Sequence, residues 1–383
     1  MERFHYAVVG AGMQGAACAY DLARRGDARE VRLFDADAER ARAVAERIDL
    51  LVGRRVAIGS TGDATDPITL APALAGADVV VSAVPYPFHQ FVHRAAFAAG
   101  ASSVDMGNDT DVTLELLAQD PQWAAAGLTL VPDTGLAPGL VNSLAAHLIQ
   151  THPDTESVRL YCGGLPVHPV PPLNYTLRFS LDGLIGEYVD EAIALRAGEV
   201  VRLPTLEEIE EVEFPGLGAL EAFTTSSGTS TAPWTYRGRL TSYEYKTLRY
   251  PGHAAIMQTF RDAGFWGEQP VDAEGVSVVP RALFRALMGP LLDRPNDPDL
   301  VATLAIAEGP TGRHGCWILA YGDLEAGFTA MERLTGFSTA IHAAAVARGD
   351  VRPGVVPYEL ALPGQAVIDA LARRGLLVRD LPA

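Results

Sequence analysis

The sequence is poor in lysine, cysteine and long apolar runs. Its cysteines (Cys18, Cys162 and Cys316) are far apart and odd in number, which favours neither a disulfide framework nor a metal site. No apolar run reaches the ~18 residues that a membrane-spanning helix needs. Basic residues number 30 against 47 acidic ones, and a net charge of −17 disfavours binding to nucleic acids or anionic membranes. The first residues lack a signal-peptide pattern, so we expect a soluble cytoplasmic protein without a metal.

Lysine is nearly absent, because Lys246 is the only lysine among the basic residues and all others are arginine. Arginine keeps its proton, whereas a desolvated lysine can lose its proton and act as a base. An arginine-biased composition would leave the same ratio. Both a catalytic and a structural role for Lys246 therefore stay open.

The chain is long and rich in apolar residues. Its 383 residues, 48% of them hydrophobic, exceed what one core usually organises, so we expect two domains. The apolar run at residues 6–9 leads into a G-x-G-x-x-G turn, and helical spacing follows. In this motif the glycines permit the turn, let the backbone approach a pyrophosphate, and let the helix pack on the strand. The expected cofactor-binding residues of this turn are Gly10, Gly12, Met13, Gln14 and Gly15.

An acidic residue lies where such a fold binds ribose. Residues 31–34 form a second expected strand, and Asp35 follows it, 20 residues after Gly15. A carboxylate there accepts hydrogen bonds from both ribose hydroxyls of NAD and repels the 2′-phosphate of NADP. Arg40 weakens that exclusion slightly. The sequence therefore predicts NAD as the cofactor.

The alternation of strands and helices continues through the first 135 residues. Expected strands at 55–58, 77–85, 103–107 and 128–132 are separated by helix-like segments, which is typical of a parallel, doubly wound Rossmann sheet. Ligands bind at the carboxyl edge of such a sheet. The residues expected at that edge are Val84, Pro85, Asp105 and Asp133. Asp63 follows the third strand and could either contact adenine or cap its own turn.

The second half contains one segment rich in functional side chains. Residues 242–253 hold the lysine, an arginine, three tyrosines and a histidine, and their alternation predicts a strand. In that strand Lys246 and Leu248 share one face, while Arg249 lies on the other. An earlier stretch, residues 183–196, has helix-like spacing.

Four motifs together resemble the saccharopine dehydrogenase-like family. They are GAGMQG at residues 10–15, GLAPG at 135–139, CGGLP at 162–166 and KTLRYPGH at 246–253. The resemblance implies an α/β fold in which a Rossmann domain (residues 1–139 and 325–383) carries an inserted mixed α/β substrate and dimerisation domain (residues 140–324). It also implies a homodimer or a higher homo-oligomer.

Within this family the chain looks nearest to members that oxidise the ε-amine of lysine. The resemblance then implies NAD-dependent oxidative deamination of L-lysine to 2-aminoadipate 6-semialdehyde and ammonia. The alternative is a saccharopine reductase-type or carboxynorspermidine-type dehydrogenase, which acts on a secondary amine. We expect the reductases to carry an acid where this chain has Ala137, which favours the simple amine. A third interpretation is a non-enzymatic sensor of NAD redox state.

The chemistry of amine oxidation defines the roles that side chains must fill. Hydride can leave only when the amine is neutral, and for a pKa of about 10.4 this costs roughly 4.6 kcal/mol at pH 7. The site therefore needs a proton acceptor and a clamp for the substrate carboxylate. The candidate catalytic residues are Lys246, His253 and Asp133, and the candidate substrate-binding residues are Arg249, Tyr250 and Tyr243. The strand alternation argues against Lys246 and Arg249 facing one pocket.

Overall fold

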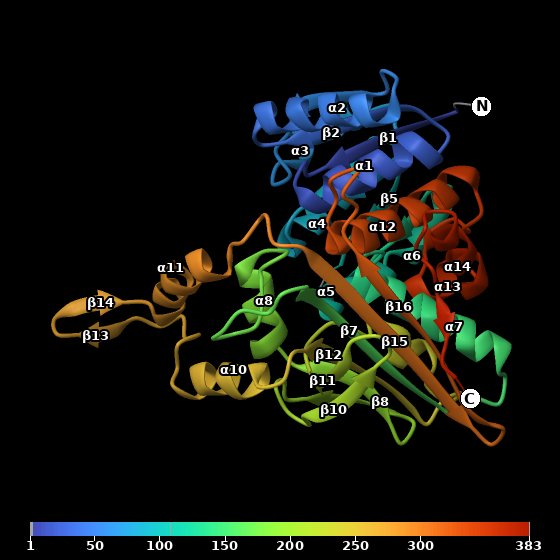
Figure 1. Cartoon of the computed structure of the whole chain (residues 1–383). Coiled ribbons are helices and arrows are strands. Elements are labelled where there is room, and N and C mark those ends of the chain that lie inside the picture. Colours follow the sequence, from blue (N-terminus) through green and yellow to red (C-terminus); the bar gives the residue numbers. More distant parts are fainter. Residues whose placement is uncertain (1–2, 108, 383) are drawn as a thin grey trace.

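A parallel sheet forms the first of two layered units. The structure, a computed structural model, describes residues 3–107 and 109–382 (Figure 1). In spatial order the strands are β17 (Gly354–Val355), β6 (Thr129–Val131), β5 (Ser102–Asp105), β4 (Val79–Ser82), β1 (Phe4–Val9), β2 (Ala28–Asp35) and β3 (Ala57–Thr61). Every neighbouring pair is parallel. The direction in which successive strands are added to the sheet reverses beside β1. In such sheets this reversal places a crevice at the carboxyl ends of β1 and β4.

Helices cover both faces of this sheet. They are α1 (Met13–Arg25), α2 (Ala38–Val52), α3 (Pro67–Leu74), α4 (His89–Ala98), α5 (Thr110–Leu117), α6 (Asp120–Ala125) and the later α12 (Ala330–Arg348). On β1, Tyr6 and Val8 share a core with α1 and α12, whereas Ala7 and Val9 share a core with α3 and α4. Alternate side chains of a strand point to opposite faces, so a strand covered on both sides is apolar throughout.

The chain leaves the first sheet after β6 and returns near its end. An irregular turn at Leu136–Leu140 leads into α7 (Val141–Thr151) and the second unit. Later α12 packs on α1, and β17 extends the first sheet beside β6. The remaining C-terminal elements are α13 (Tyr358–Ala361), α14 (Gly364–Ala372) and β18 (Arg379–Asp380), of which β18 joins the second sheet.

A mixed sheet forms the second unit (Figure 1). Its strands are β10 (Glu210–Phe214), β11 (Gly218–Phe223), β12 (Ser242–Arg249), β7 (Ser157–Pro166), β15 (Asp299–Gly309) and β16 (Gly312–Tyr321), with β8 (Ala192–Arg196) and β9 (Glu199–Leu203) joined through β12. β7 runs parallel to β12 and antiparallel to β15. Together the two sheets confirm the predicted fold class, a Rossmann sheet with a second mixed α/β unit.

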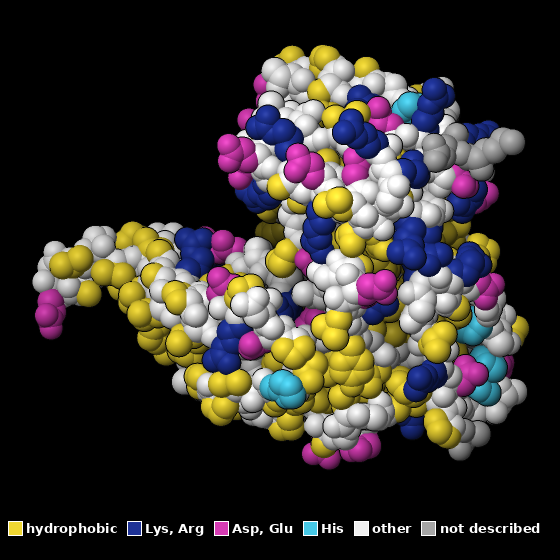
Figure 2. Space-filling view, turned by 45° about the horizontal axis from the view of Figure 1, so that its top comes forward, with side chains coloured by type: hydrophobic (Ala, Val, Ile, Leu, Met, Phe, Trp, Pro, Cys, Tyr) yellow, Lys and Arg dark blue, Asp and Glu magenta, His cyan; other side chains and the backbone are white. Residues whose placement is uncertain are grey.

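An arm of short elements extends from the second unit (Figures 1 and 2). It comprises α10 (His253–Asp262), the hairpin of β13 (Val271–Ala273) and β14 (Val276–Val278), and α11 (Pro280–Leu292). The base of the arm shares a small core with α8 (Leu181–Val189). That core holds α8 beside the second sheet and so helps to shape the site below. No helix in the described residues is long and apolar enough to cross a membrane.

Candidate active site

The glycine turn leaves an open cradle at the start of α1. Gly10 has φ +104°, and a Cβ there would lie 2.3 Å from the carbonyl oxygen of Ala83. A Cβ on Gly15 would lie 1.9 Å from the Gly10 oxygen, so these two glycines permit the tight packing of turn and helix. A Cβ on Gly12 would meet no atom within 4 Å. Open space at a helix N-terminus suits an anionic pyrophosphate, so the residues fit a dinucleotide.

Asp35 is held beside this turn at the end of β2. Its Oδ2 accepts a hydrogen bond from the backbone N–H of Ala11 over 2.9 Å, and its Oδ1 accepts one from the N–H of Asp37 over 3.0 Å. Asp37 in turn caps the N-terminus of α2. Arg40 Nη2 lies 3.8 Å from Asp35 Oδ1, but the Arg40 side chain is half exposed. The carboxylate is thus fixed where the ribose of a bound dinucleotide would lie.

A cleft of about 290 Å³ lies between the carboxyl edge of the first sheet and the second sheet. Its lining from the first unit includes Gln14, Val84, Tyr86, His89, Met106, Leu136 and Met331. Its lining from the second unit includes Cys162, Gly163, Tyr175, Phe179, Glu187, Tyr245, Thr247 and Arg249. The cleft therefore joins the predicted cofactor turn to the predicted substrate strand, as expected for a site that brings a cofactor and a substrate together.

Arg249 is the main cation of this cleft. It is 3% exposed, lies 4.8 Å from the ring centroid of Tyr175, and donates through Nη2 to Glu187 Oε2 over 3.1 Å. Burial raises the pKa of Glu187, although Arg249 opposes that shift. The Nε of Arg249 is buried and has no hydrogen-bond partner in the described chain. A buried guanidinium with a free donor is suited to binding an incoming carboxylate.

Sequence reasoning missed two histidines on the first-sheet side of the site, of which only His89 lines the cleft. His89 lines it and is hydrogen-bonded to Ser82 over 2.7 Å, while His93 is paired with Asp105 over 2.9 Å. Their spacing of four residues places both on one face of α4, the helix that follows β4, and this is a signal that could have found them. Cys162 also borders the cleft, and burial raises its pKa to about 12, which keeps the thiol protonated.

Two sequence models of one family match the chain almost end to end. The saccharopine dehydrogenase NADP binding domain matches residues 6–131, and the saccharopine dehydrogenase C-terminal domain matches residues 135–376. The chain belongs to the saccharopine dehydrogenase family. The first match spans the glycine turn and Asp35, and the second spans Arg249, so both sides of the cleft belong to this family's pattern.

Curated relatives are distant and longer. The mitochondrial alpha-aminoadipic semialdehyde synthase of Bos taurus is 28% identical over 254 residues, covering 57% of this chain and 27% of that protein. The saccharopine dehydrogenase [NADP(+), L-glutamate-forming] of Pyricularia oryzae is 26% identical over 229 residues, covering 56% of this chain and 49% of that protein. The chain thus spans about a quarter to a half of the length of these relatives. They support the family and not the finer expectation of a lysine ε-amine dehydrogenase.

Solved structures of this fold agree with the architecture. The apo saccharopine dehydrogenase (L-Glu forming) of Saccharomyces cerevisiae has a TM-score of 0.79 at 20% identity, covering 99% of this chain and 100% of that one. The Legionella pneumophila homospermidine synthase in complex with NAD has a TM-score of 0.66 at 13% identity, covering 99% and 92%. At such identities the likeness shows the fold alone.

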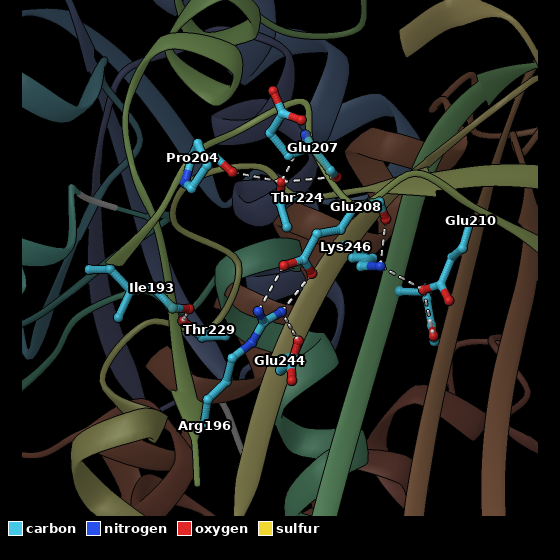
Figure 3. Close-up of polar contacts among 11 residues, drawn as sticks. Ile193, Arg196, Pro204, Glu207, Glu208, Glu210, Thr224, Thr229, Glu244 and Lys246 are labelled. Carbon is cyan, nitrogen blue, oxygen red and sulfur yellow. Dashed lines mark hydrogen bonds and ion pairs between the residues drawn. The ribbon is translucent and has the colours of Figure 1, made fainter. Parts of the chain in front are cut away.

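Lys246, one of the predicted catalytic residues, is not among the residues that line the cleft of this saccharopine dehydrogenase-family fold. Its Nζ donates to the backbone oxygen of Glu208 over 2.7 Å and lies 3.0 Å from Glu210 Oε1 (Figure 3). The physical reason is the strand period: Thr247 and Arg249 line the cleft, so Lys246 points to the other side of β12. In Figure 3 these contacts connect Lys246 of β12 to Glu208 and to Glu210 at the start of β10. They lie beside the contacts of Arg196 with Glu208 and Glu244.

The other two candidate bases are buried outside the cleft lining. His253 is hydrogen-bonded to Tyr188 over 3.0 Å and to the Leu173 carbonyl over 3.0 Å, and burial lowers its pKa to about 3. Asp133 Oδ2 accepts hydrogen bonds from Thr113 over 3.0 Å and from Ser230 over 2.5 Å. Neither residue is among those that line the cleft, so neither is placed to meet a substrate directly.

The two tyrosines predicted to bind substrate are also absent from the residues that line the cleft. Tyr243 is buried and donates to Asn142 Oδ1 over 2.6 Å, while Tyr250 donates to the Pro166 carbonyl over 2.9 Å. The structure therefore brings Arg249, alone among the predicted catalytic and substrate-binding residues, into the cleft lining.

The remaining cofactor candidates differ in their surroundings. Met13 begins α1 and is exposed, and Pro85 is exposed beside Val84, which lines the cleft. Asp105 is fully buried behind the cleft. Asp63 accepts hydrogen bonds from the N–H and hydroxyl of Thr65, so it caps its own turn, and its contact with adenine stays a prediction.

Replacing Lys246 with methionine should leave turnover within about twofold of the parent. The removed ion pair is partly exposed, with side-chain exposures of 13% and 37%. A loss of about 1 kcal/mol in the free energy of unfolding is expected for such a pair. Steady-state kinetics and urea unfolding measure the two effects, and Lys246→Arg, which keeps the charge, is the control. A loss of turnover of ~100-fold, the scale of a missing general base, would restore Lys246 as a catalytic residue.

Proposed function

We propose that this chain is an NAD(P)-dependent dehydrogenase that oxidises a carbon–nitrogen bond of an amino acid. The observation that carries the proposal is the buried Arg249, whose Nε lacks a partner in the described chain, in a cleft that begins at the open glycine turn. A bound nicotinamide would supply the acceptor for hydride. The chain's own residues would bind the substrate carboxylate at Arg249, in the cleft between the two sheets.

The charges of the cleft favour a substrate with one carboxylate and one ammonium group. Arg249 and Glu187 are the charged side chains among its described lining residues. Arg249 would bind the carboxylate and Glu187 the ammonium group. L-Lysine fits this pair and presents its ε-amine at a distance from both charges, so it is the first candidate, with 2-aminoadipate 6-semialdehyde and ammonia as products.

Saccharopine is the second candidate, because the curated relatives include saccharopine dehydrogenases. It is a secondary amine with several carboxylates, and a cleft with one arginine would leave some of them unpaired. Ala137, which lines the cleft, adds no charge to compensate. Relatives therefore support saccharopine, and the charges of this cleft support lysine.

Absorbance of reduced nicotinamide with purified protein distinguishes the candidates. The panel contains NAD or NADP with L-lysine, saccharopine, ornithine or polyamines. Reduction with lysine supports oxidative deamination, and reduction with saccharopine alone supports the secondary-amine reaction. If no combination gives an increase in the absorbance of reduced nicotinamide, the dehydrogenase proposal fails. A protein that only senses the dinucleotide is then favoured.

We infer that NAD is preferred over NADP, because Asp35 is fixed beside the turn and would repel a 2′-phosphate. Replacing Asp35 with serine should raise the ratio of kcat/KM for NADP to that for NAD by at least ~10-fold, which corresponds to about 1.4 kcal/mol. Asp63→Ser, at a turn nearby, is the matched control and should leave the ratio unchanged. An unaltered ratio in Asp35→Ser would contradict this inference.

A further inference from the structure

Two buried histidines lie one helical turn apart behind the cleft. His89 and His93 of α4 are 1% and 2% exposed, and their rings are stacked with centroids 6.3 Å apart. Each has a serine partner from a strand beneath: His89 Nδ1 lies 2.7 Å from Ser82 Oγ, and His93 Nδ1 lies 2.9 Å from Ser103 Oγ. The serines fix both rings, and so leave the Nε2 atoms for other partners.

A buried carboxylate is paired with His93 and acts on His89 through its charge. Asp105 is 0% exposed, and its Oδ2 lies 2.9 Å from His93 Nε2. Its Oδ1 accepts hydrogen bonds from the backbone N–H groups of Gly107 and Asp133, each over 2.9 Å. Burial opposes ionisation, but the nearby His89 and His93 and these hydrogen bonds outweigh it and lower the pKa of Asp105. Asp105 is therefore a negative charge at neutral pH that is hydrogen-bonded to His93 and stabilises positive charge on His89.

The histidines face two separate cavities. His89 lines the cleft that also contains Arg249. His93 lines a second cavity of about 150 Å³, whose polar lining includes Gln90, Arg94 and Glu115. The network thus reaches from the cleft to a cavity on the far side of α4.

We propose that His89 accepts the proton released in amine oxidation and that the His93–Asp105 pair passes it to the second cavity. This inference rests on the proposed dehydrogenase function. The substrate ammonium gives one proton to His89; the nitrogen lone pair then forms the C=N bond while hydride, with two electrons, leaves the adjacent carbon for the oxidised nicotinamide. Water adds to the C=N carbon and ammonium leaves, so that one proton per turnover must reach solvent. His89 is the catalytic residue, and His93 and Asp105 are positioning residues.

The charges around the network suit this role. Asp105 from β5 and His93 from its own helix act on the charge of His89. His89 shares the cleft with Glu187 and Arg249, while Arg94 and Glu115 line the cavity at His93. Burial lowers the pKa of His89 to about 4, so at neutral pH the ring is unprotonated, and Asp105 opposes this loss of basicity. Asp105 stabilises the imidazolium while the proton is in transit.

Kinetics of His89→Asn and His93→Asn test the proposal. We expect His89→Asn to lower kcat at least ~100-fold, with the dissociation constant of NAD unchanged. His89→Ala should regain turnover when imidazole is added to the solution. His93→Asn should lower kcat less, and small proton-accepting buffers should restore it. His342, another buried histidine whose pKa burial lowers to about 4, provides the control variant His342→Asn, which should turn over normally. If the parent is active and His89→Asn has the same kcat, the proton relay is overturned while the dehydrogenase function stands.

Nuclear magnetic resonance of the imidazoles gives a readout that needs no turnover. In His93→Gln the negative charge of Asp105 has only His89 left to pair with, so the pKa of His89 should rise. The ¹⁵N shifts of His89, followed through a pH titration of the full chain, measure it. If the parent protein reduces no nicotinamide with any substrate of the panel, the proposed function is refuted. If the pKa of His89 is the same in His93→Gln as in the parent, the coupling on which the relay depends is refuted.

Discussion

Replacing Gly12 with valine should abolish binding of the nicotinamide dinucleotide and leave the melting temperature of the protein unchanged. Gly12 has φ −76° and ψ −170°, which any residue can adopt, and its Cβ would meet no protein atom within 4 Å. The added side chain would occupy only the space at the N-terminus of α1 that we assign to the pyrophosphate. Loss of that contact should raise the dissociation constant at least ~100-fold, or about 2.7 kcal/mol.

Gly15→Ala is the informative comparison. Its Cβ would lie 1.9 Å from the Gly10 oxygen, so the variant must shift the turn and should lower the melting temperature. Titration calorimetry with NAD and thermal unfolding separate the two effects. If Gly12→Val binds NAD as well as the parent does, the glycine turn does not hold the dinucleotide.

Local patterns predicted strands β1 to β6 of the first sheet but not β17, and of the predicted site residues Gln14, Val84 and Arg249 line the cleft. The apolar run at residues 6–9 and the glycine spacing depend only on neighbours in the chain, and both describe β1 and the turn before α1 correctly. The two-residue period likewise predicted β12, and the separation of Lys246 from Arg249 that follows from it is confirmed. The rarity of lysine in the composition does not determine which side of the strand Lys246 occupies, and the structure places its side chain away from the cleft lining.

Contacts between distant segments account for what the sequence did not predict. Residues 183–196 were expected to be helical, but the helix ends at Val189 and the chain forms β8, which pairs with β9 and β12. The pairing of Glu187 with Arg249 joins α8 to β12, and that of His93 with Asp105 joins α4 to β5. None of these pairs can be predicted from local sequence patterns, because each joins two elements whose relative placement depends on how the sheets assemble.

Replacing Arg249 with methionine should lower kcat/KM for the amino-acid substrate about 1000-fold, mainly by raising KM. A guanidinium that binds a carboxylate through two charge-assisted hydrogen bonds contributes about 4 kcal/mol, at ~2 kcal/mol for each bond. Arg249→Lys keeps the charge but not the planar pair of donors, so it should recover only part of the loss. Binding of NAD should be unaffected, because Arg249 lies on the wall of the cleft opposite the glycine turn.

The control must account for Glu187, which loses its partner when Arg249 is removed. Removing one member of a buried ion pair typically destabilises a protein by about 3–5 kcal/mol, so reduced activity could reflect unfolding. In the double variant Arg249→Met with Glu187→Gln no buried charge is left unpaired, and the fold should regain stability while KM stays high. Circular dichroism melting and steady-state kinetics on the same samples decide the case. A double variant with parental KM would mean that Arg249 serves only to hold α8 on the sheet through Glu187 and Tyr175, and the substrate carboxylate would then have to be bound elsewhere.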